Sequence, residues 1–216
     1  MIECVVFDLD GVIVDSEQVW DDVREELVRE RGGRWHEGAQ AAMMGMSSPE
    51  WSRYMHDDLG LPEAPGEIND EVVRLMLDRY SASLPLIDGA VDTVHRLADA
   101  FTLGVASSSN RPLIEAVLEG AGITQRFAVV VSSEEVARGK PAPDVYLEAV
   151  RRLGAEPAQC AAVEDSSNGL RAARAAGMRV IAFPNAHYPP VPDALALADV
   201  VLDSLEELTP ELVRAA

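Results

Sequence analysis

Two carboxylates near the start of the chain are the residues best placed to do chemistry. Asp8 and Asp10 follow the apolar run Cys4–Phe7, and Gly11 comes directly after them. An apolar run without polar alternation predicts a strand buried on both faces, and open α/β sheets bind ligands at the carboxyl edge of such strands. Acids two residues apart point to opposite sides of a strand, so both can serve one site only if the chain turns there. Gly11 permits that turn.

Polar residues also follow three later apolar runs. Ser107 and Ser108 end one run, Glu164 and Asp165 end another, and Lys140 follows a third after several intervening residues. The carboxyl ends of parallel strands lie along one edge of a sheet. We therefore expect these groups to gather beside the first two acids.

Together these residue types suit phosphoryl transfer. A carboxylate can attack phosphorus and form an aspartyl-phosphate, and a second acid can protonate the leaving alkoxide and then deprotonate the attacking water. Several carboxylates at one point need a hard cation, and oxygen ligands beside a phosphate suit Mg²⁺. A lysine, serine hydroxyls and the N–H groups at a helix start would hold the phosphoryl oxygens.

Each group taken alone has a simpler explanation. An Asp-x-Asp at a strand end is more often a turn or helix-cap feature, and the serines before Asn110 could cap the next helix. Lys140 could be an ordinary loop lysine, and Glu164 and Asp165 could cap the helix that contains Leu170. Their joint placement, in this order along one predicted sheet edge, favours the catalytic interpretation.

The second half of the chain alternates between predicted helices and strands. Short apolar runs at 101–106, 127–131, 161–163, 180–183 and 200–202 predict strands, with helices between them. This alternation predicts an α/β fold: a Rossmann-like parallel sheet of about five to six strands with helices on both faces.

The segment 15–84 contains helical patterns but no convincing strand. Val19, Trp20, Val23 and Leu27 fall at helical spacing in its first helix. We predict two units: a catalytic core made of residues 1–14 and 85–216, and an inserted helical cap of residues 15–84.

Composition limits the partners. The formal net charge of -19, from 37 acids and 18 bases, argues against nucleic-acid binding, which needs a basic surface. No apolar run approaches the ~20 residues of a membrane span, and the first strand starts too early to leave room for a secretory leader. We expect a cytoplasmic protein that is a monomer or weak homodimer, with Cys4 and Cys160 as buried thiols.

The motifs resemble those of the haloacid dehalogenase superfamily, in the branch that contains β-phosphoglucomutase and related phosphatases, over nearly the whole chain. The matching stretches are Asp8–Glu17, Ala106–Ser109, Gly139–Asp144 and Val163–Gly169. The resemblance implies that segment 15–84 is the family's helical (C1-type) cap, which closes over the site.

The resemblance also assigns roles to individual residues. It makes Asp8 the nucleophile and Asp10 the general acid/base, and it gives Ser107 and Lys140 to the phosphoryl group. It implies a Mg²⁺ site, whose ligands would be Asp8, Asp10 through its backbone carbonyl, Glu164 and Asp165.

Three features choose among the reactions of this superfamily. Asp10 favours phosphate esters, because members that attack carbon lack an acid at that place. Hexose-phosphate mutases typically have a histidine where this chain has Trp20, and an arginine after a Gly-x-Ser where it has Ser48. We therefore predict a phosphatase acting on a small phosphorylated metabolite, such as a sugar phosphate.

Two alternatives stay open at this point. One is a hexose-phosphate mutase, in which Arg53, Arg74 or Arg79 would supply the missing cation. The other is a non-catalytic phosphate-binding module, which the intact acid and lysine motifs disfavour.

Four further residues are predicted to bind substrate. Ser108 and Asn110 would do so from the core, and Trp20 and Gly45 from the cap. The methionines beside Gly45 could add an adaptable apolar wall.

Overall fold

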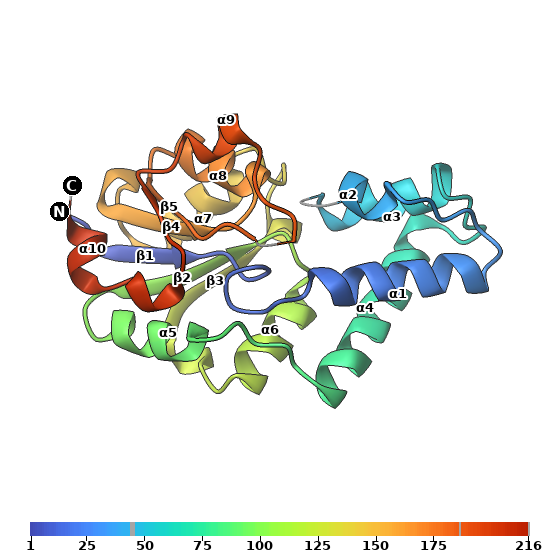
Figure 1. The fold of residues 1–216 in the computed structure, drawn as a ribbon, viewed down its shortest axis with the longest axis horizontal. Coiled ribbons are helices and arrows are strands. Elements are labelled where there is room, and N and C mark those ends of the chain that lie inside the picture. The colour runs from blue at the N-terminus through green and yellow to red at the C-terminus, as the bar shows by residue number, and fades with distance from the viewer. Residues whose placement is uncertain (44–45, 186, 216) are drawn as a thin grey trace.

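The computed structural model describes residues 1–43, 46–185 and 187–215. A sheet flanked by helices lies at one end of the molecule, and helices α1 to α4 lie together at the other (Figure 1). Within the described residues, no helix combines the length and the apolar character that crossing a bilayer requires.

The sheet is parallel and has six strands in the order β3-β2-β1-β4-β5-β6. The first strand is therefore central, and its neighbours β2 and β4 are the strands that carry the serine and acidic motifs. This arrangement confirms the predicted α/β class. The strands are β1 Cys4–Phe7, β2 Thr102–Ser107, β3 Phe127–Ser132, β4 Cys160–Glu164, β5 Arg179–Ala182 and β6 Val200–Val201.

Different helices cover the two faces of the sheet. Val5 and Phe7 of β1 pack in one apolar cluster with α5 and α6, whereas Cys4 and Val6 pack in a second with α7 and α8. The strand is thus buried on both faces, as its apolar run predicted. The core helices are α5 Ala90–Ala98, α6 Arg111–Gly120, α7 Asp144–Leu153, α8 Ser167–Ala175, α9 Pro192–Leu195 and α10 Pro210–Arg214.

The helical end of the molecule comes from the segment that follows β1. Its apolar side chains, including Trp51, Met55 and Met76, are buried and continue the cluster that begins on β1. The short helix α2 was not predicted, because a single turn and a half carries too little periodicity. These helices are α1 Glu17–Glu30, α2 Ala39–Met43, α3 Ser48–Asp57 and α4 Pro65–Ala82.

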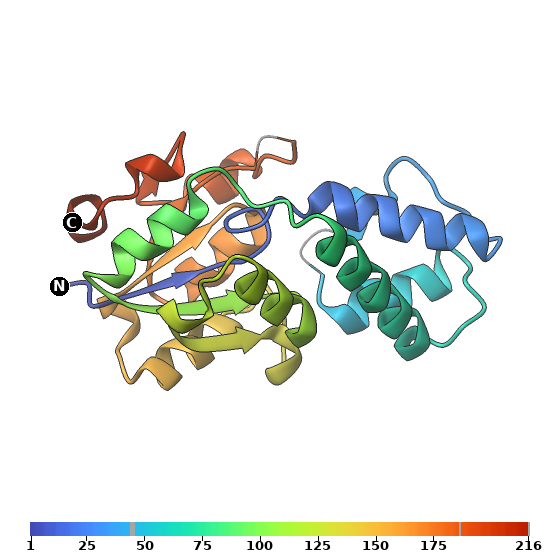
Figure 2. The ribbon, with the colours of Figure 1, turned by 90° about the horizontal axis from the view of Figure 1, so that it is seen from below.

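The chain passes between the two ends of the molecule twice, and the two passages lie side by side (Figure 2). Val14 forms an antiparallel bridge with Leu86, and the Asp15 N–H donates to the Pro85 carbonyl at 2.7 Å. These contacts support our proposal that residues 15–84 form a cap inserted into the core.

The two cysteines lie opposite each other on neighbouring strands. Cys4 of β1 is the register partner of Cys160 of β4, and both are buried free thiols. Burial raises the pKa of both, that of Cys160 to about 12. A buried thiol that resists ionisation is a poor nucleophile.

We therefore expect the native protein to react with an aromatic disulfide reagent at least about a hundredfold more slowly than the unfolded chain. Absorbance of the released thiolate measures this, with denaturant as the control that exposes both cysteines. Rapid labelling of the native protein would contradict the buried placement of Cys4 and Cys160.

Candidate active site

A tight turn after β1 brings its two acids to one place. Gly11 adopts a φ of +75°, and the Leu9 carbonyl accepts hydrogen bonds from the N–H groups of Ile13 and Val14. A Cβ atom on Gly11 would also collide with the Asp165 carboxylate. Glycine is thus required here both for the backbone angle and for the close approach of the acid from β4.

Three carboxylates from β1 and β4 meet beside this turn. Oxygens of Asp8, Glu164 and Asp165 lie within 4.8 Å of one another, and all three residues are buried. Burial raises the pKa of Asp8 and Asp165 well above the ordinary range, and the charge of Glu164 raises both further. Such a cluster repels itself unless cations lie close by.

Lys140 supplies one positive charge to this cluster. Its Nζ lies 3.0 Å from Asp8 Oδ1 and 2.5 Å from Glu164 Oε1, and its side chain is 1% exposed. Burial alone would lower the pKa of Lys140, but Asp8 and Glu164 outweigh that effect and raise it. The lysine therefore stays charged and keeps Glu164 ionised, since the pKa of Glu164 is lowered despite its burial.

Glu164 is held on both of its carboxylate oxygens. Besides Lys140, the Tyr146 hydroxyl donates to Oε1 at 2.8 Å, while Oε2 accepts from the N–H groups of Asp165 and Ser166 and from the Ser166 hydroxyl. A Cβ on Gly169 would collide with this carboxylate. Glu164 thus fixes the positions of the lysine and of the loop that begins α8.

Asp10 faces the cap side of the turn. Its Oδ1 accepts from Ser16 Oγ at 2.5 Å and Trp20 Nε1 at 3.4 Å. Its Oδ2 accepts from Ser109 Oγ at 2.7 Å and Ser107 Oγ at 3.5 Å. The same carboxylate is therefore oriented by the start of the cap and by the serine loop after β2.

Among the described residues, the serine loop contains a hydroxyl donor without a protein partner. Ser108 Oγ is buried and makes no hydrogen bond within the described part of the chain, and Ser108 lines the cavity described below. The Ser107 hydroxyl instead accepts from the Ser109 N–H at 2.9 Å. Because buried hydroxyls are nearly always bonded, the Ser108 hydroxyl is available to a ligand.

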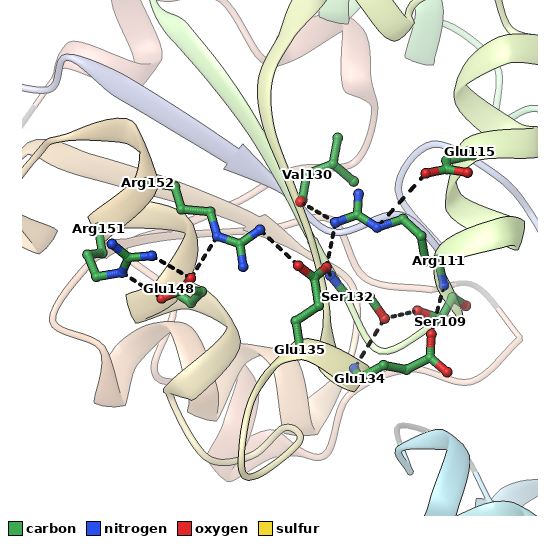
Figure 3. Close-up of polar contacts among 10 residues, drawn as sticks. All are labelled: Ser109, Arg111, Glu115, Val130, Ser132, Glu134, Glu135, Glu148, Arg151 and Arg152. Atoms are coloured by element: carbon green, nitrogen blue, oxygen red, sulfur yellow. Dashed lines mark hydrogen bonds and ion pairs between the residues drawn. The ribbon is translucent and has the colours of Figure 1, made fainter.

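A polar network behind this loop holds it in place (Figure 3). The Ser132 hydroxyl donates to the Ser109 carbonyl at 2.7 Å, and Glu134 accepts from the Arg111 N–H at 3.0 Å. The Arg111 side chain donates to the Val130 carbonyl and pairs with Glu135, so β3 supports the loop from its far side.

Asn110 connects the core to the cap. Its Oδ1 accepts from Ser48 Oγ at 2.9 Å, and its Nδ2 donates to Asn69 and to Glu134. The residue stands at the N-cap of α6, but its side chain does not cap that helix. Asn110 is not among the residues that line the cavity, so a contact with substrate stays a prediction.

A cavity of 420 Å³ lies between the acidic edge of the sheet and the cap. Asp8, Lys140 and Asp165 line it from the core, and Trp20 lines it from the cap. Of the predicted apolar wall, Met43 and Met46 line the cavity as well, while Gly45 and Met44 lie outside the described residues. The volume suits a small ligand.

Sequence reasoning missed two charged residues on this cavity wall, Glu17 and Arg24. Both lie on α1 with Trp20 between them, at spacings of three and four residues that place all three on one helix face. That spacing could have indicated that Glu17 and Arg24 share a helix face with Trp20. It was overlooked because charged residues on a helix rich in acids and bases are usually exposed to solvent.

The arginines suggested as substitutes for a mutase cation lie elsewhere. Arg53 is exposed, and Arg74 and Arg79 form ion pairs on exposed cap surfaces with Glu71, Asp78 and Glu26. Among the described residues, the cap arginine on the cavity is Arg24.

A buried group of acids with one lysine, at the carboxyl edge of a parallel sheet and facing a cavity that helices α1 to α3 also line, defines a class of hydrolases. Residues 2–177 match the model of the haloacid dehalogenase-like hydrolase family. The chain belongs to this family.

Relatives in this family are similar over most of the chain. Hexitol phosphatase B of Escherichia coli (strain K12) is 31% identical over 214 residues, which cover 96% of this chain and 95% of that protein. A bifunctional riboflavin kinase/FMN phosphatase of Arabidopsis thaliana is 33% identical over 95% of this chain, which spans 54% of that relative's length.

A solved structure shows the same fold. The crystal structure of CbbY from Rhodobacter sphaeroides in complex with phosphate superposes with a TM-score of 0.85 at 28% identity, and covers 96% of each chain. These similarities, together with the family match, show that the chain is a phosphatase-type hydrolase of the family.

Glu17 should make folding stability depend on pH. Burial and the nearby charge of Asp10 raise its pKa from 4.5 to about 7. As the pH rises, Glu17 therefore loses its proton in the unfolded chain before it does so in the folded protein. The contribution of Glu17 to the free energy of unfolding is complete below pH 4.5 and is lost as the pH approaches 7. The loss is at most about 3 kcal/mol.

Chemical denaturation of the wild type and of Glu17→Gln across this pH range measures the effect. We expect the free energy of unfolding of Glu17→Gln to fall less over the range than that of the wild type. The exposed Glu37 provides a matched control in Glu37→Gln. If the free energy of unfolding had the same pH dependence in the wild type and in Glu17→Gln, the raised pKa of Glu17 would be contradicted.

Proposed function

We propose that this protein hydrolyses the phosphate monoester of a small metabolite, with Asp8 as the nucleophile. The observation that carries the proposal is the buried contact of Asp8 with Lys140, beside Asp165, where all three residues line the cavity. Two of the relatives named above, hexitol phosphatase B and the riboflavin kinase/FMN phosphatase, are named as phosphatases of small organic phosphates, which supports the same reaction.

In this mechanism the Asp8 carboxylate attacks phosphorus, and the bond from phosphorus to the ester oxygen breaks. The product is an aspartyl-phosphate, which water then hydrolyses. Lys140 and the Ser108 hydroxyl, which has no hydrogen-bond partner within the described residues, hold phosphoryl oxygens, and they stabilise the negative charge that builds on those oxygens.

Asp10 is proposed to move the protons. It protonates the leaving alkoxide in the first step and takes a proton from the attacking water in the second. Its carboxylate is oriented for this by Ser16, Trp20 and Ser109, so the proton donor is in place only when the start of the cap and the serine loop contact it together.

The donor set fits Mg²⁺. Three buried carboxylates lie together, one lysine contacts two of them, and the Asp10 carbonyl accepts no hydrogen bond from any other described residue. Asp8, Asp165 and that carbonyl would hold the ion, which supplies positive charge to the phosphoryl oxygens. Of the predicted ligands, Glu164 has the fewest free lone pairs for a metal ion, because both of its carboxylate oxygens already accept hydrogen bonds.

Removing the nucleophile should remove the reaction. We expect Asp8→Asn to lower turnover of phenyl phosphate in Mg²⁺ by at least about a thousandfold, since an amide cannot form the aspartyl-phosphate. Release of inorganic phosphate measures this. Asp88→Asn, at an exposed acid, is the matched control and should keep full activity. Substantial activity in Asp8→Asn would rule out the mechanism.

Mg²⁺ should also stabilise the fold, because it relieves repulsion among buried carboxylates. At a concentration a hundredfold above its Kd, we expect Tm to rise by about 5 °C or more. Thermal melting with Mg²⁺ or with a chelator tests this without turnover.

The rise should shrink in Asp165→Asn and persist in Asp88→Asn. An equal rise in both variants would place the ion away from the acidic cluster.

A further inference from the structure

The cap end of the cavity contains a buried arginine that the catalytic mechanism does not use. The Arg24 residue is 5% exposed, and its guanidinium carbon lies 4.4 Å from the ring centre of Trp20 and 4.9 Å from that of Trp51. Two indoles thus hold the guanidinium against the cavity wall, where all three residues contribute to the lining.

This guanidinium has donors to spare. Within the described residues it makes one hydrogen bond, from Nη1 to Gln40 Oε1 at 3.2 Å, and its buried Nε has no partner. A guanidinium carries several N–H donors and no acceptor, and leaving them unpaired in a buried position is costly. The arrangement therefore calls for oxygen acceptors from a ligand in the cavity.

Acids surround the arginine and limit the kind of ligand that fits. Gln40, which accepts from Arg24, donates through Nε2 to Glu17 Oε2 at 3.1 Å, and Glu17 lines the same cavity. Asp10 and Asp21 also act on the Arg24 charge. One cation among three acids leaves no excess positive charge to hold a second phosphate.

We propose that Arg24 and Glu17 bind the hydroxyl groups at the end of the substrate remote from the transferred phosphate. This inference rests on the proposed phosphatase function and narrows its substrate class to polyhydroxylated monophosphates. A hydroxyl can accept from Arg24 and donate to Glu17, so it satisfies both groups. The Trp20 and Trp51 rings and Met43 offer apolar surface to the C–H groups between.

The first test removes the donors and keeps an unbranched apolar chain between the indoles. Arg24→Met should lower the ratio of kcat/KM for a hexitol monophosphate to kcat/KM for phenyl phosphate by about tenfold or more, mainly through KM. Arg53→Met, at an exposed cap arginine, should leave that ratio at the wild-type value. An unchanged ratio in Arg24→Met would overturn the inference.

The second test removes the negative charge beside Arg24. At a pH above 7, where Glu17 is mostly ionised, Glu17→Gln removes negative charge and keeps the shape of the side chain, so it should raise kcat/KM for a hexose bisphosphate relative to the hexitol monophosphate. A wild type that prefers the bisphosphate, or a Glu17→Gln variant that shifts the preference toward the monophosphate, would refute the proposed distal site.

Binding separates this inference from the proposed function. Calorimetric titration of hexitol monophosphate into Asp8→Asn, with and without Arg24→Met, reports recognition without turnover. Weaker binding in the double variant supports the distal site, whether or not the wild type hydrolyses a phosphate ester. Absence of hydrolysis by the wild type would contradict only the phosphatase proposal. Equal binding in both would refute the distal site, whatever the activity.

Discussion

The structure depends on the placement of one ammonium group among buried carboxylates. Lys140 is nearly inaccessible and lies in direct contact with Asp8 and Glu164. Without it the acids at the ends of β1 and β4 would be protonated or forced apart, because burial and mutual repulsion both raise their pKa. Tyr146 donates to Glu164, and Gly169 leaves room for its carboxylate, so the main partner of the lysine is itself held in place. The fold thus holds these buried charges in a fixed arrangement.

Much of this could be predicted from the sequence, because the relevant signals are local. Apolar runs ended by polar residues mark the strands and the edge at which they meet, and a parallel sheet then gathers Asp8, Ser107 and Asp165. The two cysteines show what local sequence signals cannot predict. Each could be predicted as buried from its own neighbours, but their pairing depends on the strand order, which places β4 beside β1.

The cap was harder to predict for a physical reason. Arg24 is charged and lies on a helix rich in charges, so its burial depends on tertiary contacts with Trp51 of α3 and Gln40 of α2. Asn110 is similar, because its position at a helix start predicts a cap or a ligand contact, whereas its amide is bonded to Ser48 and Asn69 of the cap. Side chains that join two distant segments leave no periodic trace in the sequence.

The paired passages at Val14 and Leu86 have a consequence for how such a protein can change. Because residues 15–84 leave the core and return to it at neighbouring points, they are connected to it in the same way as a long surface loop. The entropic cost of closing a loop rises only slowly with its length, so the segment can be lengthened at little cost in loop-closure entropy. Substrate preference can therefore diverge while the chemistry at the β1 edge is inherited unchanged.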